Sequence, residues 1–186
     1  KMMLASTAPT LCNECHEDVV AKVSDAKCKH SPAAAEGGCT SCHDAHASMS
    51  DKLLKQENSS KVCLSCHDKA MKAGERSLLN IAEHLGQNPH HHGPIQKGEC
   101  TPCHDPHGAD RSSLLTKNFP QKFYSAFSPD AYGLCFDCHE AEVFETAEGG
   151  DTEFRNGDRN LHYLHVNKSF KGRTCRACHD PHASKN

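Results

Sequence analysis

One short pattern, C-x-x-C-H, occurs six times in the chain and constrains its fold more than any other feature. Two cysteines three positions apart lie on the same side of one helical turn, and the next residue projects beside them. This arrangement lets two thioether bonds hold a haem while the histidine binds its iron. The cysteines of the six copies are Cys12, Cys15, Cys39, Cys42, Cys63, Cys66, Cys100, Cys103, Cys135, Cys138, Cys175 and Cys178, and the histidines are His16, His43, His67, His104, His139 and His179.

Other uses of paired cysteines do not explain the histidine. Zinc sites and redox dithiols both use C-x-x-C, and a disulfide framework uses many cysteines, but none requires a histidine directly after the second cysteine in every copy. The sequence therefore predicts six covalently bound haems c, each with one iron. Cys28 lies outside the pattern. We expect a free or buried thiol there, with an intermolecular disulfide as the alternative.

The composition fits a chain whose interior is filled by cofactors. Hydrophobic residues make up 36% of the chain, but this figure includes 13 cysteines, and there is no tryptophan. Such a chain has too few apolar side chains for an ordinary core, so the haems must supply it. We expect a mostly irregular fold with short α-helices at 13–26, 62–72 and 135–146 and little or no β-structure.

The six sites alternate in kind and define a repeat. The second, fourth and sixth sites continue as C-H-D-x-H, which adds His46, His107 and His182. Each of these sites also follows an upstream histidine, and these are His30, His92 and His165. We interpret residues 1–186 as one hexahaem domain of three dihaem units, at about 8–50, 58–112 and 130–186. The segment 113–129, with two prolines, is expected to be a linker or surface loop.

This doubled pattern resembles that of the multihaem cytochromes with paired C-x-x-C-H motifs. The likeness covers nearly the whole chain, although Ala45 replaces the proline of C-H-D-P-H in the first unit and no proline follows His165 closely in the third. The resemblance implies a haem-cored fold and electron transfer. Its members include periplasmic carriers, outer-surface cytochromes and cytochromes that form extracellular filaments.

A second strong axial ligand on each iron would keep its geometry nearly constant when it gains or loses an electron. Ten histidines lie outside the six motifs. Following the repeat, we predict that the second ligands are His30, His46, His92, His107, His165 and His182. His162 competes with His165, and His90 or His91 with His92, while His84 is expected to be a packing or surface residue. An upstream histidine has a loop long enough to cross its own haem, whereas a downstream one would bind a partner haem.

Three functions compete for such a chain: an electron conduit, a reductase of nitrite or a similar oxyanion, and a haem-bearing structural or sensory protein. A reductase needs an open iron position with acidic or cationic groups around it. All six motifs are alike and histidines are in surplus, so we favour an electron carrier without catalytic residues. Its expected partners are redox proteins or extracellular electron acceptors. A net charge of -3 does not favour nucleic acid, and no apolar run is long enough to cross a membrane.

Covalent attachment of haem takes place outside the bacterial or archaeal cytoplasm, so we expect an exported protein, extracellular or at the cell surface, with the periplasm as the alternative. The first attachment site begins at Cys12 and the last ends at His179. With a haem near each end, head-to-tail contacts would produce an open filament. We therefore expect a homopolymer, and a monomeric periplasmic shuttle is the rival.

Overall fold

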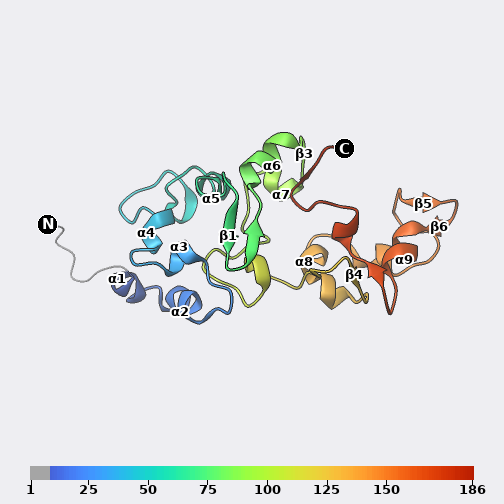
Figure 1. The fold of residues 1–186 in the computed structure, drawn as a ribbon, viewed down its shortest axis with the longest axis horizontal. Coiled ribbons are helices and arrows are strands. Elements are labelled where there is room, and N and C mark those ends of the chain that lie inside the picture. The colour runs from blue at the N-terminus through green and yellow to red at the C-terminus, as the bar shows by residue number, and fades with distance from the viewer. Residues whose placement is uncertain (1–8) are drawn as a thin grey trace. The chain divides into compact units, whose positions relative to one another are not determined.

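The computed structural model describes residues 9–186, which form short helices and very short strands joined by loops (Figure 1). The α-helices are α1 (Thr10–Asn13), α2 (Glu17–Asp25), α3 (Ser31–Ala34), α4 (Cys39–Cys42), α5 (Ser59–Leu64), α6 (Ile81–Gln87), α7 (Gly93–Gln96), α8 (Gly133–Phe136) and α9 (Leu161–Val166). The 3-10 helices are η1 (Asp51–Leu53), η2 (Ser112–Leu114), η3 (Pro129–Tyr132), η4 (Ala141–Phe144) and η5 (Cys175–Ala177). Within the described part of the chain, no helix is long and apolar enough to cross a membrane.

The described residues form two compact units, and all strands pair antiparallel in twos within a unit. The first unit comprises residues 9–116 with 182–186, and the second comprises 117–181. In the first unit β1 (Met71–Ala73) pairs with β2 (Arg76–Leu78), and β3 (His90–His91) pairs with β8 (Ala183–Ser184). In the second unit β4 (Tyr124–Ser125) pairs with β7 (Gly172–Arg173), and β5 (Arg155–Asn156) pairs with β6 (Arg159–Asn160).

Asparagine side chains fix the start of three helices. Asn58, Asn80 and Asn160 accept hydrogen bonds from backbone N–H groups three residues later, at 2.9, 3.0 and 3.2 Å. These bonds satisfy donors that the first turn of a helix leaves unpaired. Asn80 lies two residues after β2 and Asn160 is the last residue of β6, so the same hairpin–helix arrangement occurs in both units, as β1–β2–α6 and β5–β6–α9.

The two units differ in what fills them. All seven phenylalanines and three tyrosines of the chain lie between 119 and 170, in the second unit. There Tyr132 is fully buried, and its ring lies 5.7 Å from that of Phe127 and 6.0 Å from that of Phe136. In the first unit the buried hydrophobic side chains among the described residues are Leu115 and Ala183. Its side-chain core is therefore as thin as the composition predicts.

The expected irregular fold with short helices is confirmed, with differences in detail. Helix α2 lies inside the expected range 13–26, but helix α5 ends at Leu64 and the chain enters a hairpin at Met71. Gly74, at φ 62°, provides the left-handed turn of that hairpin. The expected helix at 135–146 is divided into α8 and η4. The three dihaem units stay a prediction, and residue 8, where the first was expected to begin, lies outside the described residues.

Candidate haem sites

All six C-x-x-C-H motifs adopt the same turn. In each, the histidine N–H donates to the carbonyl of the first cysteine, over distances of 2.8 to 3.1 Å. The turn lies on α1, α4, α5, α8 and η5, and at the fourth site, Cys100–His104, it stands outside a regular helix. Because one helical turn separates the two cysteines, both sulfurs project to one side and the histidine follows beside them. Each motif thus has the local form that covalent haem attachment requires.

The first cysteines of neighbouring sites lie together, in three pairs. The thiols of Cys63 and Cys100 are hydrogen-bonded, which raises the pKa of Cys63 and lowers that of Cys100 to about 7. The hydrogen bond from Cys135 lowers the pKa of Cys175 in the same way. These contacts place the sulfurs of the third and fourth sites, and of the fifth and sixth, beside each other.

The first and second sites show the same contact. Burial raises the pKa of Cys39, and its hydrogen bond with the Cys12 thiol adds to the rise. Burial also raises the pKa of Cys42, with a smaller contribution from nearby Cys66, so the second and third sites are neighbours as well. Thioether formation would remove these thiol protons and leave the sulfurs adjacent.

Four pairs of imidazoles have the spacing of two ligands on one iron. A histidine nitrogen binds a transition metal at about 2 Å and the ring centroid lies about 1 Å further back, so two rings on opposite sides of one iron have centroids about 6 Å apart. The pairs are His43–His107 at 6.2 Å and 12°, His104–His182 at 6.2 Å and 8°, His30–His67 at 6.5 Å and 15°, and His162–His179 at 6.5 Å and 24° between ring planes. The residues present therefore fit haem iron.

Each pair combines a motif histidine with one from another part of the chain. His107 and His182, from C-H-D-P-H turns, lie opposite the motif histidines of the second and fourth sites. His30 lies opposite His67 of the third site. The loop between His30 and Cys39 was expected to let His30 reach the haem of the second site instead. Each of these three contacts therefore joins one of the dihaem units expected from the sequence to the next.

Hydrogen bonds orient the paired rings. The Nδ1–H groups of His43, His104 and His30 donate to the carbonyls of Lys52, Ser113 and Pro106, over 2.8, 2.7 and 3.0 Å. A carbonyl can only accept, so this bond fixes the proton on Nδ1 and leaves the Nε2 lone pair for a metal.

Burial also favours the metal-binding form of several of these rings. It lowers the pKa values of His30, His67, His107 and His162. These side chains are therefore neutral at neutral pH, and the neutral imidazole is the form that binds metal.

The carbonyls that hold His43 and His104 come from an unusual turn that the sequence analysis missed. Lys52 and Leu53 in η1, and Ser113 and Leu114 in η2, have φ between 54 and 60°. Left-handed backbone costs a non-glycine residue about 1–2 kcal/mol, and such strain concentrates at functional sites. The signal in the sequence is a Leu-Leu pair at the same distance after both motif histidines.

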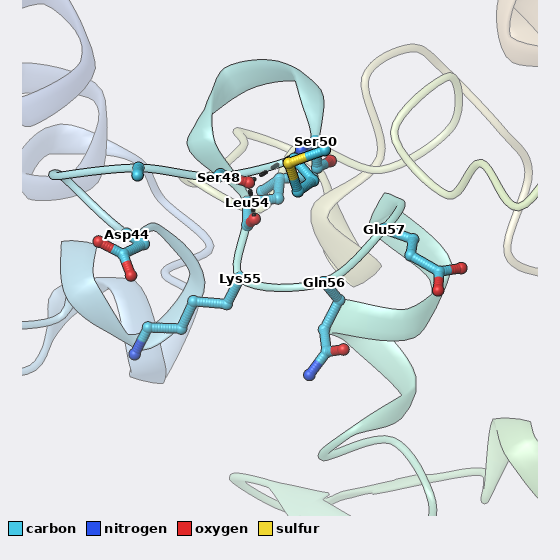
Figure 2. Close-up of a pocket in the computed structure, with 9 residues that line it drawn as sticks. Asp44, Ser48, Ser50, Leu54, Lys55, Gln56 and Glu57 are labelled. Atoms are coloured by element: carbon cyan, nitrogen blue, oxygen red, sulfur yellow. Dashed lines mark hydrogen bonds between the residues drawn. The ribbon is translucent and has the colours of Figure 1, made fainter.

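Around the first of these turns, Ser48 Oγ donates to the Leu54 carbonyl over 2.5 Å and accepts from the Ser50 N–H over 2.9 Å. Figure 2 shows this loop, together with Asp44 and Lys55, which line the adjacent pocket. An isolated β-bridge between His43 and Leu54 connects this loop to the C-x-x-C-H motif of the second site. The hydroxyl thus braces the segment that supplies the Lys52 carbonyl.

The aspartate of C-H-D-x-H shapes the turn that carries the next histidine. Asp44 and Asp105 each accept the backbone N–H two residues later, at 3.0 Å. Asp105 also accepts from Lys22 Nζ at 2.7 Å. Burial alone would raise the pKa of Asp105, but the hydrogen bonds from Lys22 and the His107 N–H outweigh it and lower that pKa. The turn at the fourth site is thereby tied to α2.

The other predicted ligands have different surroundings. The side chain of His46 is 93% exposed, with Nδ1 at 3.9 Å from Asp44, and His16 is exposed. The His92 N–H donates to the His182 carbonyl, and His139 lies in the common motif turn. His165 donates from Nδ1 to the Leu161 carbonyl at 2.7 Å. Among residues 9–186, no ring contact joins His165 to a motif histidine, and His16 and His46 have none with another imidazole.

The remaining candidates lie close to the sites or brace them. His84 packs edge-on to His182 at 6.5 Å, and His91 Nε2 bonds the Leu85 carbonyl at 3.0 Å. Cys28 exchanges two backbone hydrogen bonds with Ala109, just after His107, and its thiol is partly exposed.

The fold and these sites define a multihaem c-type cytochrome. The chain belongs to the family described as "Doubled CXXCH motif", whose model matches residues 30–72 and 92–144, just over half of the chain. It is also similar to a protein of Shewanella baltica (strain OS185) named "Multiheme cytochrome MtrA", with 27% identity over 132 residues. That match covers 70% of this chain and 31% of the relative, so the chain spans about a third of the relative's length.

Proposed function

We propose that this chain is an electron carrier with six covalently bound haems c. When bound, each haem supplies an iron that cycles between the ferric and ferrous states. The six motif histidines hold one side of each iron, and histidines from elsewhere hold the other. The observation that carries this proposal is the set of four imidazole pairs at 6.2 to 6.5 Å.

These pairs favour a carrier over a reductase. An iron held by two imidazoles keeps no position open for a substrate, whereas a reductase needs one. The carbonyls of Lys52, Ser113 and Pro106 fix the orientation of three of these rings, and such outer contacts also raise the basicity of a metal-binding imidazole.

The cysteine contacts support three dihaem pairs within the chain. Cys12 lies beside Cys39, Cys63 beside Cys100, and Cys135 beside Cys175, which corresponds to the three units expected from the sequence. The proximity of Cys42 and Cys66 connects the first pair to the second. Closely spaced attachment points are what electron transfer between haems requires.

Carbon monoxide distinguishes carrier from reductase, because it binds a ferrous haem with an open position and not one with two histidines. We expect the reduced protein not to bind carbon monoxide at concentrations where copies of the chain associate with one another. Stoichiometric binding in the intact protein, together with turnover of nitrite, would favour the reductase.

We further propose that the chain is a subunit of an extracellular conductive filament. His46 lies in the same kind of aspartate-held turn as His107, yet its ring is exposed. His16 is a motif histidine and is exposed too. Such surface imidazoles could complete coordination with a second copy of the chain. Contacts of that kind between unlike surfaces generate open filaments.

Light scattering and electron microscopy over micromolar concentrations test the filament. We expect the wild-type holoprotein to polymerise, His46→Ala to shorten or abolish the polymer, and the exposed His90→Ala control to behave as wild type. A wild-type monomer at every concentration would overturn the filament and favour a monomeric periplasmic shuttle, while the carrier function would stand.

We also propose that the protein is exported to the cell surface or beyond and exchanges electrons with redox proteins or extracellular acceptors. The support is the covalent attachment chemistry, which takes place outside the cytoplasm. Protease treatment of intact cells tests this placement: surface protein is degraded, whereas periplasmic protein survives until the outer envelope is opened.

A further inference from the structure

We propose that His162, and not His165, is the second axial ligand of the iron at the sixth site, with Thr152 as its positioning residue. This inference rests on the proposed function, because it takes a haem to be attached to Cys175 and Cys178. It assigns an iron ligand that the repeat pattern does not indicate.

The two rings already have the required arrangement. The His162 and His179 centroids lie 6.5 Å apart with 24° between the ring planes, close to the 6.2 to 6.5 Å of the other three pairs. The rings of Phe144 and Phe154 both meet His162 edge-on at 5.2 Å. The imidazole is therefore held between two aromatic side chains and half-buried.

The helix that carries His162 is firmly fixed. Asn160 is fully buried, caps α9 through the Tyr163 N–H, and donates to the carbonyls of Val143 and Thr146 at 2.6 and 3.0 Å. His162 is the second residue of α9, so these bonds fix its backbone directly.

Thr152 is placed to hold the His162 tautomer that binds iron through Nε2. Its Oγ1 lies 2.8 Å from His162 Nδ1 and also accepts the Phe154 N–H at 3.2 Å. A hydroxyl can donate or accept, and its oxygen has two lone pairs that accept both bonds when the proton of His162 is on Nδ1. With the proton on Nδ1, the Nε2 lone pair of His162 is left for metal.

His165 points to a different environment. Nδ1 of His165 donates to the Leu161 carbonyl of its own turn, which leaves its Nε2 free as well, so the two histidines are distinguished by what their rings contact. Its ring lies against Phe154 at 5.7 Å. Within the described residues it makes no ring contact with His179.

Two single variants of the haem-loaded full chain, His162→Ala and His165→Ala, test the assignment by electron paramagnetic resonance and carbon monoxide binding. We expect His162→Ala to convert one haem per chain to the high-spin ferric form and to bind one carbon monoxide when reduced. Added imidazole should return that haem to low spin, which shows that the variant is folded. His165→Ala should leave the haem on Cys175 and Cys178 low-spin.

The proposal is overturned if His162→Ala stays entirely low-spin, or if His165→Ala makes the haem on Cys175 and Cys178 high-spin. A peptide containing Cys175 and Cys178 without bound haem in the wild type would instead overturn the proposed function at this site. Failure of the two proposals is therefore distinguishable.

Thr152→Val tests the positioning role. It should keep the haem low-spin but shift the midpoint potential of one haem, because the hydrogen bond to an axial histidine tunes its basicity. The control is Ser24→Ala in α2, where the lost hydroxyl bonds only Ala21 and Asp25 of its own helix. A redox titration of Thr152→Val that gives the same midpoint potentials as the wild type would show that Thr152 has no positioning role.

Discussion

The rings of His104 and His182 lie nearly parallel, 6.2 Å apart and 8° between planes, although His104 belongs to the fourth C-x-x-C-H motif and His182 follows the sixth. The backbone supports this contact, since β8, directly after His182, pairs with β3, and the His182 carbonyl accepts the His92 N–H. The end of the described chain is thus held against the fourth site.

This relationship predicts which haem loses a ligand in His182→Ala. We expect the haem on Cys100 and Cys103 to become high-spin, and the haem on Cys175 and Cys178 to stay low-spin. Nuclear magnetic resonance of the reduced wild type checks this, because the ring protons of His182 should show cross-peaks to the haem on Cys100 and Cys103. Cross-peaks to the sixth haem instead would contradict the pairing.

Gly108 allows the turn after His107 to approach α2. Its φ is 127°, and an added Cβ would lie 2.6 Å from the Ala26 Cβ and 3.2 Å from the Lys22 carbonyl oxygen. We expect Gly108→Ala to lower the free energy of unfolding of the oxidised holoprotein by about 1–3 kcal/mol, measured by urea denaturation.

A matched glycine in α6 provides the control for that experiment. Nothing lies within 4 Å of a Cβ added at Gly86, so Gly86→Ala should raise the free energy of unfolding by up to about 1 kcal/mol through helix propensity. Equal stability of the two variants would contradict the close approach at Gly108.

Tyr132 is fully buried, and burial raises its pKa to about 12. Its hydroxyl has no hydrogen-bond partner among the described residues. Replacing an unsatisfied polar group by an apolar one of the same shape is nearly neutral or stabilising. We therefore expect Tyr132→Phe to keep or slightly raise the free energy of unfolding, and Tyr132→Ala to cost about 3–5 kcal/mol. A loss above about 1 kcal/mol in Tyr132→Phe would show that the hydroxyl is bonded in the holoprotein.

Haem removal should unfold the chain. The buried hydrophobic core of the described residues consists of Leu115, Tyr132, Val166 and Ala183, which is too little to offset the conformational entropy of the chain. Protein expressed without haem attachment should give a random-coil circular dichroism spectrum and degrade rapidly. A cooperative thermal transition of the haem-free chain would contradict this expectation.

Local features of the sites could be read from the sequence, because each depends on residues close together in the chain. The turn joining Cys63 to His67, for example, follows from one helical turn, and the thin core of the first unit follows from its lack of aromatic residues. The sequence also directed attention to His107 and His182 as partners of other haems.

Long-range features could not be predicted. The partner of His67 is His30, which comes from the preceding dihaem unit, and no local spacing specifies that His30 should reach His67. His162 and His165 lie on the same short helix and both contact Phe154, so only the contacts of His162 with Phe144 and His179 distinguish them. The carbonyls of Lys52 and Ser113 were missed because a backbone group has no residue type of its own, and the Leu-Leu pair that follows each of them does not by itself indicate a left-handed turn.

The central claim, that histidine pairs hold the haem irons, is tested most directly by electron paramagnetic resonance of the oxidised holoprotein at concentrations where it is assembled. The account predicts spectra dominated by low-spin ferric haem with two imidazole ligands, with haem peptides recovered from all six motifs. A major high-spin ferric signal in the intact protein would contradict it.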